Sequence, residues 1–319
     1  MLRAFRSLTD AMTSRIVVAG SSNTDMVLQV EHLPQPGETI LGGRFSMAAG
    51  GKGANQAVAA ARAGGDVTFL ARVGNDLFGE RAIEGFRRDA INVDHVWRDG
   101  NAPSGVALIF VADGGENSIG VASGANGRLS PADIDTVADS ISSADVLLMQ
   151  LETPIETVER AAAVAAAAGV RVILNPAPAQ PLGDELLRRV SVLTPNESEA
   201  GQLTGVEVTD VETSAAAARL LRSKGVQAVI VTLGSRGVYV QSDEFTGAVP
   251  AFEVEPVDTT AAGDVFNGAL AVALAEGTSL SDAVQFANAA AARSVTKLGA
   301  QPSAPTRKNI QSLLVTGRL

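Results

Sequence analysis

The stretch Val257-Asp258-Thr259-Thr260-Ala261-Ala262-Gly263-Asp264 leads directly into residues 265–275, an apolar segment that is typical of a buried helix. The first N–H groups of a helix have no partner within it, and the helix dipole is positive at that end. Because glycine lets a ligand approach the backbone, this junction predicts a phosphate-binding helix start. At its edge, Asp264 could accept the proton of a hydroxyl that attacks a nucleotide's terminal phosphoryl. An aspartate at a helix start is most often only the N-cap, worth about 1 kcal/mol, and Gly-Asp alone favours that interpretation.

Composition limits the classes of protein that the chain can form. Its 319 residues are 46% hydrophobic and 19% charged, which suits one large α/β domain or two smaller ones. We expect a single domain over residues 15–310, after a loose tail over residues 1–14. A net charge of −10 opposes nonspecific binding to nucleic acid and to anionic membranes. There is no cysteine and no apolar run long enough for a transmembrane helix, so a cytoplasmic protein is the expectation.

Short apolar runs alternate with helix-like segments through the middle of the chain. This order predicts an α/β fold with a doubly wound, mostly parallel sheet sandwiched by helices. The predicted strands are residues 16–20, 67–73, 145–151, 170–174, 190–194 and 228–232, and the predicted helices are residues 56–63, 78–90, 154–168 and 213–224.

Two segments break this alternation because their strands have no helix between them. Residues 26–30 and 39–41 are extended patterns on either side of a turn at residues 34–37. Residues 105–111 and 117–122 face one another across Asp113-Gly114-Gly115-Glu116, a hairpin signal. We predict that these strands form a small antiparallel β lid, inserted at about residues 25–48 and 98–123.

A second glycine-rich junction, Ala49-Gly50-Gly51-Lys52-Gly53-Ala54-Asn55, precedes the predicted helix 56–63. It does not have the spacing of a nucleotide P-loop. From the residues alone, a packing cluster and a ligand-binding loop explain it equally well.

Polar residues follow several predicted strands, at the edge where open α/β sheets bind ligands. Glu152 follows the strand 145–151, and Asn196 and Glu199 lie three residues apart after the strand 190–194. Such a pair could hold hydrated magnesium indirectly, although a capped helix is favoured on spacing alone. Residues 232–237 join a strand to a hairpin, where glycines could either admit a nucleotide or make the turn.

Taken together and in order, these stretches resemble the PfkB carbohydrate kinase family, the ribokinase-like sugar kinases. The resemblance extends over about residues 15–310. It is carried by residues 20–25, 50–55, 149–152, 175–179, 194–197, 258–268 and 299–303. It implies an enzyme that uses ATP and Mg²⁺ to phosphorylate D-ribose at O5, giving D-ribose 5-phosphate and ADP.

The resemblance also implies roles for individual residues. Asp264 is expected to be the catalytic base, beside an anion hole of Ala261, Ala262 and Gly263. Sugar binding is expected at Asn23, Thr24, Asp25, Gly51, Lys52, Gly53, Ala54, Asn55, Glu152 and Asp264. Binding of Mg-ATP is expected at Asn196, Glu199, Thr232, Leu233, Gly234, Ser235, Arg236, Gly237, Gly263 and Asn288. An activating K⁺ is expected at Asp258, Thr260, Ser294, Lys297, Gly299 and Ser303, mostly through backbone carbonyls.

The family relationship further implies a homodimer that forms through the lid, with residues 26–28 and 106–109 as candidate contacts. Among enzymes, a deoxyribokinase or another sugar or nucleoside kinase is the alternative. A catalytically silent sugar sensor is a second alternative, which the intact Gly263-Asp264 pair disfavours. A dinucleotide enzyme is disfavoured because Gly20-Ser21-Ser22-Asn23 stands where Gly-x-Gly-x-x-Gly would begin. His32 and His95 lie outside every candidate cluster and are expected to be surface or packing residues.

Overall fold

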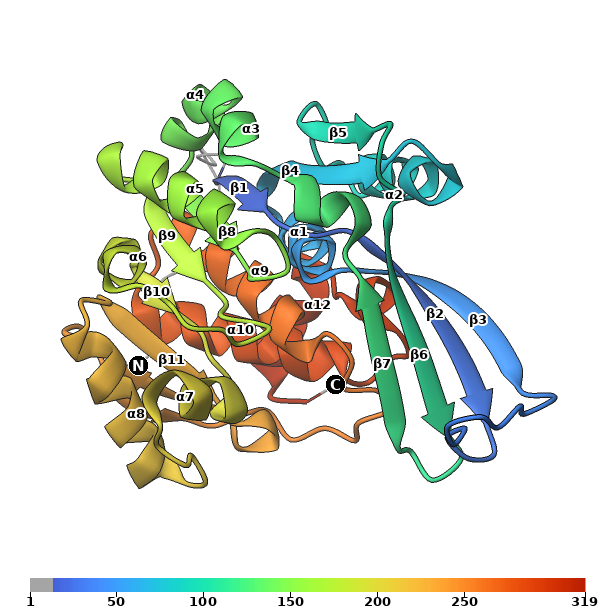
Figure 1. Ribbon diagram of the computed structural model, residues 1–319. Helices are drawn as coiled ribbons and strands as arrows, with labels where there is room; N and C mark the ends of the chain where they lie inside the picture. The colour runs from blue at the N-terminus through green and yellow to red at the C-terminus, as the bar shows by residue number, and fades with distance from the viewer. Residues whose placement is uncertain (1–13, 319) are drawn as a thin grey trace.

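A nine-stranded sheet forms the centre of the computed structural model, which describes residues 14–318 (Figure 1). The strand order is β13-β12-β11-β10-β9-β8-β1-β4-β5. Neighbours from β5 to β11 are parallel, whereas β12 and β13 add antiparallel strands at one edge. The strands are β1 Arg15–Ala19, β4 Asp66–Gly74, β5 Val96–Asp99, β8 Val146–Met149, β9 Arg171–Leu174, β10 Val192–Leu193, β11 Ala228–Thr232, β12 Val238–Gln241 and β13 Thr246–Val249. Apart from Ser14, the predicted tail lies outside the described residues.

Helices cover both faces of this sheet (Figure 1). One face packs against α1 Lys52–Arg62, α2 Leu77–Arg88, α9 Ala262–Ala275, α10 Leu280–Ser294 and α12 Arg307–Thr316. The other face packs against α3 Pro131–Thr136, α4 Ala138–Ser142, α5 Ile155–Ala167, α6 Asp184–Arg189, α7 Glu197–Thr204 and α8 Val211–Ser223. Along β1, Ile16 and Val18 enter the first core while Val17 and Ala19 enter the second. Apolar residues on both faces are what a buried parallel strand requires, and the predicted doubly wound fold is confirmed.

A separate four-stranded sheet, the lid, projects from the body (Figure 1). Its strands are β2 Asn23–Val30, β3 Arg44–Gly50, β6 Gly105–Ala112 and β7 Asn117–Ala122, in the order β3-β2-β6-β7. Both outer pairs are antiparallel, as predicted. The central pair, β2 with β6, is parallel because both strands leave the body at the same edge and run outward.

Two predicted boundaries differ from the structure for local reasons. Residues 39–41 are not a strand, and β3 begins only after Gly42 and Gly43, which adopt φ angles of 100° and 93°. The helix expected from Gln56 begins at Lys52, inside the glycine-rich junction. Its glycines serve close packing as well as turning: a Cβ on Gly53 would lie 2.5 Å from the backbone nitrogen of Ser21.

Close packing of α1 against α9 brings the starts of these two helices together. A Cβ on Gly268 would lie 2.6 Å from the carbonyl oxygen of Gln56, so only glycine permits this approach. Residues near 55 and 264 therefore meet, although they lie far apart in the sequence. Within residues 14–318, none of the helices combines the length and apolar character that crossing a bilayer would need. The short helices α11 Ala300–Ser303, η1 Gly124–Arg128 and η2 Gly234–Arg236 complete the fold.

Candidate active site

The candidate site lies where the carboxyl ends of β1, β8, β9, β10 and β11 meet the starts of α1 and α9 (Figure 1). Parallel strands end at the same edge, so polar residues that follow them converge there. Polar side chains follow the strands as expected: Asn23, Asn175 and Thr194 are buried, Glu152 is half-buried and Asn196 is exposed.

Asp264 is buried in the first turn of α9, with 6% of its surface exposed. Both carboxylate oxygens accept hydrogen bonds from α1, Oδ2 from Asn55 Nδ2 at 2.9 Å and Oδ1 from Gln56 Nε2 at 3.0 Å. Asp264 does not cap its own helix: the N-cap is Ala261, in a left-handed conformation with φ 59°. The N-cap interpretation of Asp264 is therefore wrong, and its carboxylate is held by a different helix.

Opposing effects set the charge of Asp264. Burial raises its pKa, while the charge of Lys52 and the two amide hydrogen bonds lower it, and the charge of Glu152 raises it again; the net shift is upward. Hydrogen bonds to the ionised form favour that form, which is the form that a proton acceptor needs.

A chain of buried amides stands behind Gln56. Gln150 Nε2 donates to Gln56 Oε1 at 2.6 Å, and Gln56 Nε2 also lies 3.1 Å from Asn175 Oδ1. Asn175 Nδ2 in turn donates to the carbonyl of Thr194. These amides come from α1 and from the residues that follow β8 and β9, so they join the sheet edge to Asp264.

A second polar chain stabilises the backbone at the start of α9. The hydroxyl of Thr194 donates to Asn267 Oδ1 at 2.7 Å, and Asn267 Nδ2 donates to the carbonyl of Gly263 at 2.8 Å. The backbone around Gly263 is thus fixed from both the sheet and its own helix.

On the lid side of Asp264, carboxylates and amides gather around the start of β2. Glu152 Oε2 accepts from Ser21 Oγ at 2.5 Å and from the Lys52 backbone N–H at 2.9 Å. Asn23 Oδ1 accepts from Asn126 Nδ2 at 2.7 Å. A cavity of about 390 Å³, here called the lid-side cavity, is lined by Asn23, Asn126 and Glu152.

Asp25 lies on β2, close enough to the other carboxylates for their charges to raise its pKa. Burial is the main cause, the charges of Glu152 and Asp264 add to it, and together they raise the pKa of Asp25 to about 6. Three carboxylates therefore share a small region, and a ligand that donates hydroxyl hydrogen bonds to them would relieve their repulsion.

Asp264 itself lines a cavity of about 210 Å³, here called the anion chamber. It is lined by Lys52, Asn196, Glu199, Ala262 and Gly263, among others. A lysine and an unpaired helix start are two features that attract phosphate.

Asn196 and Glu199 form the reciprocal capping box that the sequence favoured. Asn196 Oδ1 accepts from the Glu199 N–H at 2.8 Å, and Glu199 Oε2 accepts from the Asn196 N–H at 2.9 Å. Burial raises the pKa of Glu199, partly offset by the Asn196 hydrogen bond and by Lys52. Glu199 Oε1 makes no hydrogen bond to any described residue, so one oxygen stays available to a metal-bound water. In the described range, no group of three His, Cys, Asp or Glu side chains could hold a metal ion directly.

A larger cavity, about 510 Å³, adjoins the anion chamber and is here called the Asn288 cavity. Thr259 and Ala262 line both spaces, so the two are adjacent. Gly234, Ser235, Phe252 and Asn288 form other parts of its wall. Asn288 Nδ2 donates to the carbonyl of Pro250 at 3.2 Å and is thereby held in place.

Other residues of the 232–237 stretch are engaged elsewhere. Leu233 is buried in the core that faces α7 and α8. Arg236 pairs with Glu197 and donates to the carbonyl of Thr209. Gly237 ends η2 with a φ angle of 91°, and Thr232 lines the anion chamber.

Asp258 ties together two of the segments at which the sequence predicts a K⁺ site. Its Oδ1 accepts from the Thr260 N–H at 2.9 Å and its Oδ2 from the Gly299 N–H at 2.7 Å. Burial opposes ionisation of Asp258, but these hydrogen bonds outweigh it and lower the pKa. The carbonyl of Ser294 accepts from the Lys297 N–H, so Lys297 is linked back to the end of α10. Ser303 is buried in α11, and its hydroxyl donates to the carbonyl of Ala300.

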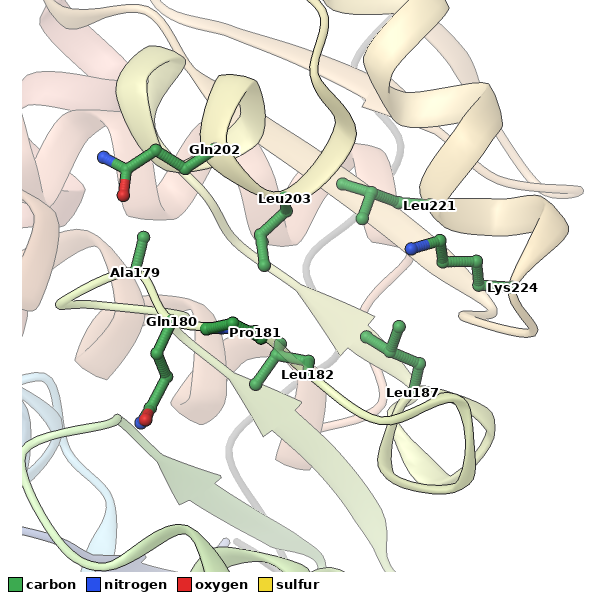
Figure 2. A pocket seen from close by; sticks show the side chains of 9 residues that line it. All are labelled: Ala179, Gln180, Pro181, Leu182, Leu187, Gln202, Leu203, Leu221 and Lys224. Carbon is green, nitrogen blue, oxygen red and sulfur yellow. The ribbon is translucent and has the colours of Figure 1, made fainter.

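A further cavity of about 460 Å³ is lined differently from those above (Figure 2). Leu182, Leu187, Leu203 and Leu221 surround it, and the side chain of Lys224 reaches toward it (Figure 2). Its wall is mainly aliphatic, so it is a poor match for a sugar or a phosphate.

Comparisons with known proteins agree with this arrangement. A sequence model described as pfkB family carbohydrate kinase matches residues 13–307. This chain belongs to the PfkB family of carbohydrate kinases. The family prediction is confirmed, and the dinucleotide-enzyme alternative is wrong.

Relatives within the PfkB family match the chain over nearly its full length. Ribokinase of Haemophilus influenzae is 46% identical over 303 residues, which cover 95% of this chain and 99% of that protein. Deoxyribokinase of Salmonella typhi is 38% identical over 300 residues, covering 94% and 98%. The solved structure of Arabidopsis thaliana ribokinase complexed with ribose and ATP has a TM-score of 0.90 at 36% identity, and the match covers 95% of this chain and 99% of that chain.

Among the residues that the PfkB resemblance singled out, Lys52, Asn196, Glu199 and residues 261–264 line the anion chamber, and Asn23 and Glu152 line the lid-side cavity. Thr24 differs in orientation. Pairing of β2 with β3 and β6 places Asn23 and Asp25 on one face of the lid and Thr24 on the other. Thr24 lines a separate cavity beside α2. Its side chain therefore does not point to the same space as that of Asp25.

Sequence reasoning missed the residues that hold the site in shape. Gln56 lies directly after the glycine-rich junction, and Gln150 and Asn175 lie within stretches that carried the PfkB resemblance. Asn126 has no such signal, because it is in η1 and meets Asn23 only through the fold.

Proposed function

We propose that this PfkB-family chain transfers the terminal phosphoryl group of ATP to O5 of D-ribose, giving D-ribose 5-phosphate and ADP. The observation that carries the proposal is the position of Asp264, a buried carboxylate that lines the anion chamber and whose charge interacts with those of Asp25 and Glu152 on the lid side. The ribokinase names of its relatives, and the ribose and ATP complex of the Arabidopsis protein, support both substrates.

The sugar hydroxyls would bind to Asn23, Asp25, Lys52, Asn55 and Glu152. Carboxylates accept hydrogen bonds from hydroxyl groups, and side-chain amides both donate and accept them, so this set of residues matches a polyol. Gly51, Gly53 and Ala54 would act through their backbone, because larger side chains would block the approach of α1 to β1. A sugar lacking a hydroxyl would leave one of these buried polar groups without a partner.

ATP would lie in the Asn288 cavity, with its terminal phosphoryl group in the anion chamber. The N–H groups at Ala261, Ala262 and Gly263 would stabilise the charge on the transferring group. Asp264 would take the proton from O5 as the new bond forms. Because Lys52 lines the anion chamber and follows the sugar-binding glycines, it would contact the phosphoryl group from the sugar side.

Magnesium would enter with the ATP phosphates and be held through water by Asn196 and Glu199. The free Glu199 Oε1 and the lack of a three-ligand cluster within residues 14–318 fit such indirect binding. Bound Mg²⁺ would neutralise charge on the phosphate oxygens.

We further propose that K⁺ binds beside the start of α9, between the segments that Asp258 joins. The ligands would be backbone carbonyls near Thr260, Ser294, Lys297 and Gly299, with Ser303 close by. The low pKa of Asp258 supports the site, because a fixed negative charge there favours a cation.

For the lid we propose a homodimer contact on its sugar-side face. Strand register places Val27, Ile109, Ile119 and Val121 on the same face as Asp25. Ile119 and Val121 are more than half exposed, at 57% and 54%. A partner seated there would cover both these residues and the sugar. Residues 15–310 would form one domain, since both apolar cores extend across them, and the cysteine-free composition supports a cytoplasmic location.

The proposal is tested by measuring ADP release in a coupled assay that contains ATP and Mg²⁺. The substrates compared are D-ribose, 2-deoxy-D-ribose, fructose and adenosine. We expect D-ribose to give the highest kcat/KM. Preference for 2-deoxy-D-ribose would assign the activity of the Salmonella relative instead. Ribose binding without turnover on any of the four would contradict the kinase proposal and favour a sensor.

A further inference from the structure

A cavity of about 590 Å³ lies behind the lid, between its base and α2, and is here called the α2 cavity. Thr24, Met47 and Ala49 enter it from the face of the lid opposite to Asp25. Phe78 and Ala82 of α2 and Pro302 of α11 line it from the body. It is distinct from the lid-side cavity, the anion chamber and the Asn288 cavity.

Three arginines give the α2 cavity a positive charge in a chain whose net charge is −10. Arg62 is neutralised, because it pairs with Asp89 at 2.7 Å and donates to the carbonyl of Gln301 at 2.6 Å. Arg81 and Arg88 are exposed, and neither forms an ion pair with any described residue. Two guanidinium groups at this cavity therefore remain without an anionic partner.

The lining defines the kind of molecule that would fit. Phenylalanine, methionine, alanine and proline offer an apolar surface, while guanidinium groups bind phosphate and carboxylate oxygens in pairs. The volume is in the range of small-molecule sites, about 300–1,000 Å³. We propose that the α2 cavity binds an amphipathic organic anion, with its apolar body against Phe78 and Met47 and its anionic group at Arg81 and Arg88.

The α2 cavity shares a wall with the sugar side of the protein. Asn23 lines both the α2 cavity and the lid-side cavity, and Ser22, next to it, is fixed by Asn126 through its N–H and its carbonyl. A bound anion would thus contact the point where β2 leaves the body. If the kinase function proposed above holds, occupancy of the α2 cavity changes the KM for ribose more than it changes kcat.

Binding is tested on the full chain with its active site blocked by ribose, Mg²⁺ and a non-hydrolysable ATP analogue. The probe is 8-anilinonaphthalene-1-sulfonate, a fluorescent aromatic anion. The variant is Arg81→Gln with Arg88→Gln, and the matched control is Arg87→Gln with Arg98→Gln. Arg87 and Arg98 are exposed and do not line the cavity, and both pairs remove two charges.

We expect the Arg81/Arg88 variant to bind the probe at least about tenfold more weakly, roughly 1.4 kcal/mol, and the control to bind like the unmodified chain. Phenyl phosphate and benzoate should both displace the probe, and their relative potency identifies the preferred anionic group; benzyl alcohol should not displace it. The proposed site would be ruled out if the unmodified chain did not bind the probe, or if the two double variants lost the same amount of probe affinity.

The coupling to the sugar has its own measurement, the KM for ribose with and without phenyl phosphate. The coupling is supported if phenyl phosphate shifts the KM for ribose in the unmodified chain and in the control but not in the Arg81/Arg88 variant. An identical response in all three proteins assigns the effect to the anion chamber and overturns the coupling. Because probe binding needs no turnover, it is judged separately from the kinase proposal.

Discussion

The side-chain nitrogen of Gln56 lies 3.0 Å from Oδ1 of Asp264, joining the first turns of α1 and α9 across 208 positions of sequence. The same nitrogen is 3.1 Å from Asn175, and the Gln56 oxygen accepts from Gln150. Gln56 therefore fixes the orientation of the proposed base and ties it to the carboxyl edge of the sheet. It is a positioning residue, since it acts on the reaction only through Asp264.

Gln56→Met should lower kcat and move its acid limb to higher pH. Removing a hydrogen bond to the ionised carboxylate raises the pKa of Asp264 further, so more of the enzyme is protonated at a given pH. A loss of about 10- to 100-fold in kcat is expected from misplacement of the base. The measurement is the pH profile of kcat at saturating substrates.

Gln150→Met is the matched control, because it removes the donor to Gln56 but no bond to Asp264. It should cause a smaller shift of the acid limb. If Gln56→Met lowers only thermal stability and leaves the pH profile in place, the residue has no positioning role.

Asp264→Asn should reduce kcat by about 100- to 10,000-fold, the usual contribution of a general base. Asn55 Oδ1 is buried and has no hydrogen-bond partner among the described residues, so the Asn55 amide can rotate and accept from the new amide group. The variant should therefore fold and bind ribose and ATP with nearly unchanged affinity, measured by calorimetry. Turnover close to that of the unmodified chain would exclude Asp264 as the base.

Local patterns predicted the main features of the fold and site. Alternating apolar runs indicated the strands and helices, and Asp264, Glu152 and Asn196 were placed correctly at a helix start or after strands, because those positions depend on neighbouring residues. The start of α1 at Lys52 was missed. Glycines favour a loop locally, whereas in the fold the first N–H groups of α1 donate to Glu152 and Ser21, and Gly53 packs closely against Ser21.

Contacts between distant segments could not be predicted in the same way. The bonds of Gln56 to Asp264, and of Asn126 to Asn23, depend on how α1, α9 and η1 are placed by the whole sheet. An amide offers the same donor and acceptor to any neighbour, so its sequence position does not identify its partner. The opposite orientations of Thr24 and Asp25 follow from strand alternation, but only once β2 is known to begin at Asn23.

Asp25→Asn should stabilise the sugar-free protein at neutral pH. The pKa of Asp25 is about 6 when folded against 3.8 as its ordinary value, so the folded state binds the proton more tightly. Its ionisation therefore costs stability as pH rises from 3.8 through 6, by at most about 3 kcal/mol at about 1.4 kcal/mol per pKa unit.

Thermal unfolding from pH 4 to pH 8 measures this effect. The gain in Tm from Asp25→Asn should be full above pH 6 and shrink toward zero near pH 3.8. The exposed lid residue Asp113, changed to Asn, is the control and should show no such trend. Ribose affinity should fall in Asp25→Asn, and a variant that is less stable at pH 7.5 would contradict the assigned repulsion.

Replacing K⁺ by Na⁺ or Li⁺ should lower activity, and Asp258→Ala should abolish the difference between the ions. The Asp258 carboxylate holds the N–H groups of Thr260 and Gly299, so its loss releases the segments that supply the carbonyl ligands. Thr260→Ala keeps the backbone groups and should keep the K⁺ response. If both variants lost the K⁺ response to the same extent, side chains and not backbone carbonyls would bind the ion.

Asn126→Ala should raise the KM for ribose by about tenfold, in line with loss of one buried polar contact, and leave the KM for ATP unchanged. Asn126 Nδ2 donates to Asn23 Oδ1 at 2.7 Å, and its oxygen accepts from the Ser22 N–H at 2.9 Å. Without these bonds Asn23 can rotate away from the sugar, while the anion chamber, which neither Asn23 nor Asn126 lines, is untouched. Ser123→Ala, in the same lid-side cavity, is the control and should match the unmodified chain. If Asn126→Ala instead lowered kcat and left the KM values for ribose and ATP unchanged, Asn126 would support the catalytic step and would not orient Asn23 for sugar binding.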